Sequence, residues 1–277
     1  MDTFYIIPNE TKDVNLEITN RIIDYVEKHG GKCTVASVDE HWHIKPGTVP
    51  DKADCAIVLG GDGTMTQAAR ELRGYNIPIL GINMGTLGYM AEVEIDNIEE
   101  SLQKLLDDEY YMEIRTMIQG SINGESPKTA MNDIVTMREN GLRVVAFNVY
   151  VNGELLNTYI GDGVIISTPT GSTGYNLSAG GPILEPSADI LVITPICSHS
   201  LNTRSIVLSA ENYIEIEIGE PRHKGVEQAS VSFDAKECIP LVTGDRIRIK
   251  KTGESVVFLK LNKESFMRTM CRKMKGN

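Results

Sequence analysis

The chain has 277 residues, of which 41% are hydrophobic and 23% charged, and its formal net charge is −11. This length and composition predict a globular protein of one large or two ordinary domains. The negative charge argues against sequence-independent nucleic-acid binding, because such proteins carry a basic patch or stripe.

Phosphate ligands remain compatible with this charge, since backbone N–H groups and a divalent metal bind polyphosphate without a basic surface. The five cysteines are scattered and contain no C-x-x-C pair, so neither a disulfide framework nor a zinc site is indicated. The N-terminal residues lack the pattern of a signal peptide, and no apolar run of about 18 residues is present. We therefore expect a cytoplasmic protein without nucleic-acid or membrane partners.

The first hundred residues alternate between strand and helix patterns. Val14, Ile18, Ile22 and Val26 recur at four-residue intervals and predict an amphipathic helix that ends near Gly30. Strand–helix alternation favours a parallel sheet covered by helices. Strands are expected at 4–7, 33–38, 55–59 and 77–82, and further helices at 65–73 and 98–107.

From about residue 110 the pattern changes to short strands of alternating polarity. Ile214, Ile216 and Ile218 alternate with glutamates, and Asn152-Gly153 predicts a hairpin turn. Such strands without intervening helices predict an antiparallel sandwich. We expect a Rossmann-like parallel-sheet α/β domain over 1–105 and an all-β sandwich domain over 106–261, with a basic helical tail (262–277) packing back on the first.

A glycine-rich turn follows the apolar strand at 55–59. It reads Gly60-Gly61-Asp62-Gly63-Thr64, and a helix pattern comes next. Glycine lets the backbone approach a ligand closely, and the N-terminus of a helix attracts phosphate oxygens. Asp62 would repel phosphate unless it accepted a hydroxyl proton or helped to position a metal. The bland alternative is a tight turn in which Asp62 caps the helix.

A second glycine turn, Asn83-Met84-Gly85-Thr86-Leu87-Gly88-Tyr89, follows the strand at 77–82. The carboxyl ends of neighbouring parallel strands meet at one edge of a sheet, so both turns are expected to face one crevice.

Two polar segments follow in the β-rich half. Asn132-Asp133 offers a donor and acceptors suited to sugar hydroxyls, although such a pair is also common in ordinary turns. The segment 161–182 joins an Asp-Gly turn, a buried strand and a loop crowded with hydroxyl groups, which suits a nucleoside. The histidines show no metal-ligand spacing, so no metal ligand is assigned to protein side chains.

Taken in chain order, these segments closely resemble the NAD kinase family. The first glycine motif is shared with diacylglycerol, sphingosine and phosphofructokinase-like kinases, whereas the hydroxyl-rich loop is far more specific to NAD kinases. The matching segments are 60–64, 83–89, 132–133, 161–163, 168–175 and 194–204.

The resemblance implies an enzyme that transfers the γ-phosphoryl group of ATP to the 2′-hydroxyl of the adenosine ribose of NAD, giving NADP. Mg²⁺ or Mn²⁺ would bridge the ATP oxygens, and Asp62 would be the catalytic proton acceptor. A homo-oligomer, dimer or tetramer, is also implied. Residues at the ATP phosphates would be Gly60, Gly61, Gly63 and Thr64. Residues that bind NAD would be Asp62, Gly63, Asn132, Asp133, Arg143, Asp162, Thr173, Gly174, Tyr175, Asn176, Leu177 and Ser178.

The chain departs from the family pattern at four places. Asp133 stands where Glu is more frequent, Gly174 replaces Ala, and Ile160 stands where a basic residue is frequent. Asp234-Ala235-Lys236 replaces the sequence Asp-Gly-Gln, which puts a ligand role for that turn in doubt.

Two other functions fit parts of the pattern. A lipid kinase or other kinase could share the first glycine motif, but a lipid acceptor would favour an apolar pocket over a hydroxyl-rich loop. A non-catalytic NAD(P)-binding regulator could share the scaffold, but it would have no need of Asp62.

Overall fold

The structure is a computed structural model that describes residues 1–39, 43–45, 47–85, 88–139, 144–199, 203–220, 225–262 and 266–275. Contacts between Cα atoms divide the chain into two compact units. The first unit contains Met1–Arg115 and Ser255–Asn277, and the second contains Thr116–Glu254. Within the described residues, no helix is long and apolar enough to span a membrane.

The first unit is built on a mixed, mostly parallel sheet. The strands pair in the order β2-β1-β3-β4-β19-β6, and β5 also pairs with β4. All of these pairs are parallel except that of β19 with β6. The strands are β1 (Thr3–Ile7), β2 (Lys32–Val35), β3 (Cys55–Gly60), β4 (Ile79–Asn83), β5 (Val93–Glu94), β6 (Tyr111–Arg115) and β19 (Val256–Lys260).

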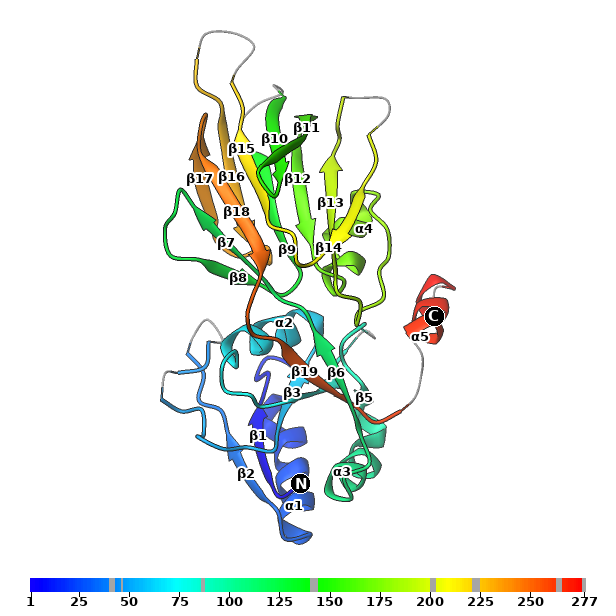
Figure 1. Cartoon of the computed structure of the whole chain (residues 1–277). Helices are drawn as coiled ribbons and strands as arrows, with labels where there is room; N and C mark the ends of the chain where they lie inside the picture. Colours follow the sequence, from blue (N-terminus) through cyan, green and yellow to red (C-terminus); the bar gives the residue numbers. More distant parts are fainter. Residues whose placement is uncertain are drawn as a thin grey trace. The chain divides into compact units, whose positions relative to one another are not determined.

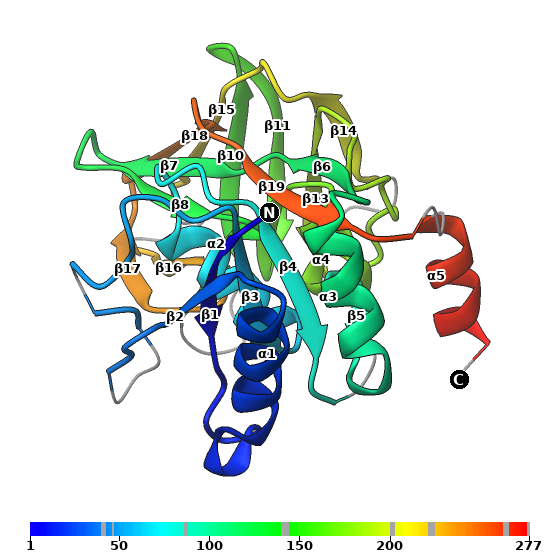
Figure 2. The ribbon, with the colours of Figure 1, turned by 90° about the horizontal axis from the view of Figure 1, so that it is seen from below.

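Helices cover both faces of this sheet. The described helices are η1 (Val14–Leu16), α1 (Glu17–Lys28), α2 (Asp62–Glu71), η2 (Ile95–Asn97), α3 (Ile98–Leu106) and α5 (Phe266–Met274). Helices α1 and α3 lie side by side (Figure 2) and share a core with Leu80 and Ile82 of β4. Gly81 lies between these two residues on β4, and a side chain there would meet Met65 of α2. Side chains alternate across a strand, so α2 covers the opposite face.

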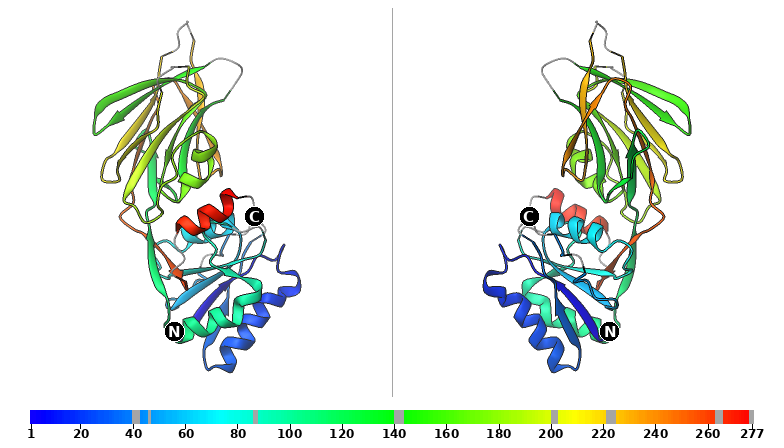
Figure 3. Two further views of the ribbon diagram at one scale, coloured as in Figure 1. Left: turned by 90° about the vertical axis from the view of Figure 1, so that its right-hand side faces the viewer. Right: turned by 90° about the vertical axis from the view of Figure 1, so that its left-hand side faces the viewer.

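The second unit contains two antiparallel sheets (Figures 1 and 3). One has the order β11-β10-β15-β18-β7-β8, and the other has the order β14-β13-β12-β9-β16-β17. Their strands are β7 (Ile118–Ile122), β8 (Lys128–Ala130), β9 (Asp133–Arg138), β10 (Val145–Val151), β11 (Glu154–Gly161), β12 (Gly163–Ser167), β13 (Ile190–Ile196), β14 (Ile206–Ser209), β15 (Ile214–Ile218), β16 (Gln228–Phe233), β17 (Cys238–Val242) and β18 (Arg246–Lys251).

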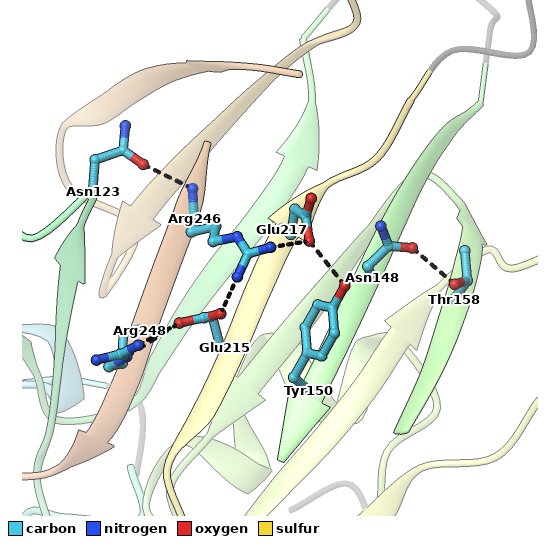
Figure 4. A network of polar contacts seen from close by, with 8 residues as sticks. All are labelled: Asn123, Asn148, Tyr150, Thr158, Glu215, Glu217, Arg246 and Arg248. Carbon is cyan, nitrogen blue, oxygen red and sulfur yellow. Dashed lines mark hydrogen bonds and ion pairs between the residues drawn. The ribbon is translucent and has the colours of Figure 1, made fainter. Parts of the chain in front are cut away.

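The two sheets share one hydrophobic core, because apolar residues alternate along their strands. Ile214 and Ile216 of β15 belong to it, together with Ile166 of β12 and Val231 of β16. The outer face of β15 is charged instead. There Arg246 pairs with Glu215 and Glu217, each at 2.9 Å, as Figure 4 shows. Tyr150 and Arg248 extend this network, so the charged groups on this face pair with one another.

The outer face of the second sheet has a small apolar cluster of its own. Val135, Ile165 and Ile196 form it, and Ala179 packs against it. Ala179 follows the short helices η3 (Gly171–Thr173) and α4 (Tyr175–Ser178), which belong to the hydroxyl-rich loop. This packing fixes where that loop lies, on the outer face of β9, β12 and β13.

The expected fold class, a Rossmann-like α/β unit joined to an antiparallel β-sandwich, is confirmed. The compact units differ from the expected limits at 105 and 261. Strands β6 and β19 pair with each other, and β19 also pairs with β4, so both extend the first sheet. Helix α2 begins at Asp62 rather than near 65, which places the end of the glycine motif inside its first turn.

Candidate functional site

In the first unit, the motif at 60–64 joins the buried strand β3 to helix α2. Gly61 is extended, with φ −110° and ψ −172°, and it caps the helix. A side chain at Gly60 would overlap Thr64, so this position requires glycine. A side chain at Gly63 would meet no atom within 4 Å, so the backbone there is open on one side. The unpaired N–H groups of this helix terminus are suited to an anion.

Asp62 connects the two glycine turns. Its carboxylate accepts hydrogen bonds from the backbone N–H groups of Tyr89 at 2.8 Å and Met90 at 3.1 Å. Gly88 lies so close to this carboxylate that a methyl group there would overlap Oδ1. Asn83 closes its own turn by bonding both the N–H and the carbonyl of Gly85. The two turns therefore meet, as their positions after neighbouring strands led us to expect.

A cation and a cavity adjoin these turns within the first unit. A methyl group built on Gly85 would lie 3.2 Å from the Lys12 ammonium nitrogen, and one on Gly61 would lie 3.8 Å from it. Beside α2 lies a cavity of about 230 Å³, and its walls include Asn9, Thr64 and Gln67. Asn9 donates a hydrogen bond to the Thr64 hydroxyl at 3.3 Å, which connects the loop after β1 to the first turn of α2. This region combines a positive charge with free space.

In the second unit, the hydroxyl-rich loop is hydrogen-bonded to the turn that contains Asn132. The Thr168 N–H donates to the Asn132 carbonyl at 2.9 Å, and the Thr168 hydroxyl donates to the Met131 carbonyl at 2.6 Å. A side chain at Gly171 would overlap the Asn132 backbone. Two segments that are separate motifs in the sequence therefore form one surface.

Asp133 is the most perturbed carboxyl group of this surface. It is only 5% exposed, and none of the described residues donates a hydrogen bond to its carboxylate. Burial, reinforced by the negative charge of Asp234, raises its pKa from 3.8 to about 7. A buried carboxyl without a protein partner is costly to the fold, and such groups are typical of functional sites.

The polar side chains of the hydroxyl-rich loop point in two directions. Ser172 and Asn176 are fully buried and bind other parts of the chain. The Asn176 amide donates to the carbonyls of Ser172 and Pro182 and accepts from the Thr194 hydroxyl at 2.7 Å. Asn176 therefore supports the loop from inside. Within this loop, the partly or fully exposed members of the predicted NAD-binding set are Thr173, Gly174, Tyr175, Leu177 and Ser178.

Asp162 and Tyr175 lie near each other on the same surface. The Asp162 carboxylate accepts a hydrogen bond from Arg138 Nε at 2.7 Å. Partial burial raises the pKa of Tyr175, and the charges of Cys197, Asp162 and Asp133 add to that effect. Tyr175 therefore faces both aspartates that the sequence singled out.

Two charged residues of the site belong to no sequence motif, and one predicted NAD-binding residue lies outside the described residues. Arg143 belongs to the residues that the structure does not describe, so its assignment remains a prediction. Lys12 and Arg138 belong to no motif, so no local pattern marks either residue, and the departure at Asp234-Ala235-Lys236 left the role of Asp234 in doubt. No group of three His, Cys, Asp or Glu residues in the described ranges has a metal-binding arrangement.

Comparison with known proteins identifies relatives along the whole chain. Residues 45–110 match the model of the ATP-NAD kinase N-terminal domain, and residues 131–261 match that of the ATP-NAD kinase C-terminal domain. The NAD kinase of Lachnoclostridium phytofermentans is 43% identical over 274 residues, which is 96% of each chain. The NAD kinase of Agathobacter rectalis is 41% identical and covers 100% of this chain and 99% of its own.

Two solved structures share the fold at lower identity. Yeast NADH kinase in complex with NADH superposes with a TM-score of 0.84, at 23% identity, over 100% of this chain and 88% of its own. An NAD kinase from Archaeoglobus fulgidus in complex with ATP has a TM-score of 0.75, at 23% identity, over 98% of this chain and 97% of its own. At this identity the two structures support the fold alone.

Proposed function

The chain belongs to the NAD kinase family, and from that premise we propose which of its residues carry the reaction. The enzyme is a phosphotransferase that transfers the γ-phosphoryl group of ATP to the 2′-hydroxyl of the adenosine ribose of NAD, giving NADP. Phosphoryl transfer depends mainly on positioning the reactants and neutralising charge, so the task is to find the groups that do both.

The surface around Asn132 and Asp133 binds NAD. The observation that carries this assignment is the buried Asp133 carboxyl, which has no hydrogen-bond donor among the described residues. Its oxygen atoms accept hydrogen bonds from ribose hydroxyls, and Asn132 supplies donors and an acceptor to the adenosine. Thr173, Gly174, Tyr175, Leu177 and Ser178, which are partly or fully exposed, form the rest of the surface together with Asp162. Arg143, which lies outside the described residues, is kept as a proposed NAD contact.

The glycine turn at 60–64 binds the ATP phosphates. Gly61, Gly63 and Thr64 present backbone N–H groups at the positive end of α2, Gly60 ends the strand that leads into it, and the Lys12 ammonium adds a charge beside them. Mg²⁺ or Mn²⁺ enters, in this proposal, as part of the ATP complex, as substrate.

Asp62 accepts the proton of the ribose 2′-hydroxyl. The two backbone hydrogen bonds hold its carboxylate in one orientation beside the phosphate-binding turn. Asp62→Asn keeps the shape of this side chain but removes the proton acceptor. We expect kcat to fall at least ~100-fold, while the Kd for NAD stays within about threefold of the parent.

The matched control is Asp54→Asn in the same unit. The Asp54 carboxylate also binds two backbone N–H groups, those of Asp2 at 2.8 Å and Thr3 at 2.9 Å, but at the other end of β3. The control should retain kcat. If Asp62→Asn formed NADP at the parent rate in a coupled assay, Asp62 would not be the proton acceptor.

We also propose a cytoplasmic homo-oligomer, dimer or tetramer. The edge strand β11 supports association, because its Leu155 is 57% exposed and its Leu156 is 38% exposed. Apolar side chains on an open sheet edge favour pairing with another chain. Size-exclusion chromatography with light scattering would show a monomer if this proposal is wrong.

A further inference from the structure

The carboxylate of Asp234 holds the backbone of the turn that carries Asn132 and Asp133. It accepts hydrogen bonds from the N–H groups of Met131 at 2.9 Å, Asn132 at 2.7 Å and Asp133 at 3.2 Å. In return, the Asp234 N–H donates to the Asp133 carbonyl at 3.0 Å. Four hydrogen bonds thus join two segments that lie about one hundred residues apart in the sequence.

The backbone around Asp234 is strained to make these contacts. Asp234 has φ +51° and Ala235 has φ +53°, and the Lys236 N–H bonds back to the Phe233 carbonyl at 3.2 Å. Two successive positive φ values define a type I′ turn, for which glycine and asparagine are preferred. Non-glycine residues in this region cost stability and persist where the surrounding contacts require them. Here the turn directs the Asp234 carboxylate at the three N–H groups.

Asp234 also affects the charge of Asp133. The described ionisable groups that face Asp133 are Asp234, from the turn between β16 and β17, and Tyr175, from α4. The negative charge of Asp234 adds to burial in favouring the protonated form of Asp133. An ionised Asp133 is the better acceptor for ribose hydroxyls, so NAD affinity is expected to rise with pH through about 7.

We propose that Asp234 is a positioning residue for NAD binding, which acts by holding the backbone at 131–133 so that Asn132 and Asp133 are presented to the ribose. This inference rests on the proposed function of that surface. It gives a role to the turn whose departure from the family pattern left its function in doubt.

Asp234→Asn and Asp234→Gly test the proposal, because both residues tolerate the positive φ. Asp234→Asn removes the charge and keeps an oxygen acceptor, whereas Asp234→Gly removes the side chain. The control is Asp245→Asn in the same unit, since the Asp245 carboxylate likewise binds a turn N–H, that of Val242, at 2.7 Å. Kd for NAD and KM for both substrates would be measured from pH 5.5 to pH 9.

At pH 9 we expect Kd for NAD to rise about 10-fold in Asp234→Asn and further in Asp234→Gly, with KM for ATP within about twofold. The rise of NAD affinity with pH should begin at a lower pH in both variants than in the parent, a shift that a merely structural turn would not cause. Amide hydrogen exchange at 131–133 should be faster in both variants than in the control. Affinity, pH profile and exchange that all match the control would overturn the proposal.

Asn132→Ala and Asp133→Asn separate this inference from the function on which it rests. If both bind NAD as tightly as the parent, the NAD surface itself is misassigned. If both lose affinity while the Asp234 variants retain it, the surface stands and only the role of Asp234 is wrong.

Discussion

Replacing Asp133 by Asn should change the stability of the fold in a way that depends on pH. The Asp133 carboxyl ionises near pH 3.8 when unfolded and at about 7 when folded. Because the pKa is higher in the folded state, proton binding by Asp133 stabilises the fold. This contribution to the free energy of unfolding is fully present below pH 3.8 and is lost as the pH rises through about 7. At about 1.36 kcal/mol per pH unit, the full loss is about 4 kcal/mol, of which about 3 kcal/mol falls between pH 5 and pH 8.

Asn cannot ionise, so Asp133→Asn should be free of this loss. Relative to the parent, the variant should gain about 3 kcal/mol of unfolding free energy between pH 5 and pH 8. The absolute difference at pH 5 also contains the cost of an unsatisfied buried amide, about 1–3 kcal/mol, so the change with pH is the informative quantity. The same variant should bind NAD more weakly, because the amide offers a poorer acceptor to the ribose hydroxyls.

Urea unfolding followed by far-UV circular dichroism at pH 5, 6, 7 and 8 would measure this change. The control is Thr136→Val on the same strand, β9. The Thr136 hydroxyl is buried and has no hydrogen-bond partner in the described residues, so its removal should change stability by the same amount at every pH. A change of less than ~1 kcal/mol between pH 5 and pH 8 in Asp133→Asn, relative to the parent, would refute the reasoning.

Two further substitutions test the turns. Gly88→Ala should lower kcat at least ~10-fold, because the added methyl group displaces the Asp62 carboxylate. The control Gly253→Ala should retain kcat, because no atom lies within 4 Å of its added methyl group. Equal rates in both variants would show that the orientation of Asp62 is unimportant. Ala235→Gly should raise the free energy of unfolding by about 1 kcal/mol, because glycine adopts φ +53° without strain. If urea unfolding shows a lower free energy of unfolding than in the parent, the turn is unstrained.

Local sequence patterns were sufficient to predict many of the helices and strands and their division into two kinds of sheet. The four-residue spacing of Ile18, Ile22 and Val26 and the alternation of Ile214, Ile216 and Ile218 reflect the geometry of a helix and of a strand, which neighbouring residues alone define. Val14 was expected on the same helix face, but it lies in η1, before α1 begins at Glu17, and its side chain is 62% exposed. The start of α2 was placed three residues late. Glycine has low helix propensity, so Gly63 argued against a helix at that position. In the structure Gly61 is the N-cap, and Gly63 lies in the first turn of α2.

The glycine turn, Asn132-Asp133 and the hydroxyl-rich loop were likewise visible as motifs, because their residue types have a chemical meaning at that spacing. The direction of each side chain was not. Ser172 and Asn176 look like their exposed neighbours in the sequence, yet the structure turns both inward, since the loop must satisfy its own buried carbonyls where it packs on the sheet.

Sequence by itself determined many of the elements of this protein, the family it belongs to and the motifs that carry its chemistry, because these depend on residues close together in the chain. Only the tertiary structure decided that β19 joins the first sheet and that Asp234 holds the Asn132 turn. Both outcomes depend on the register between strands far apart in the sequence. A local pattern does not encode that register, because it is set by how the strands pair and pack.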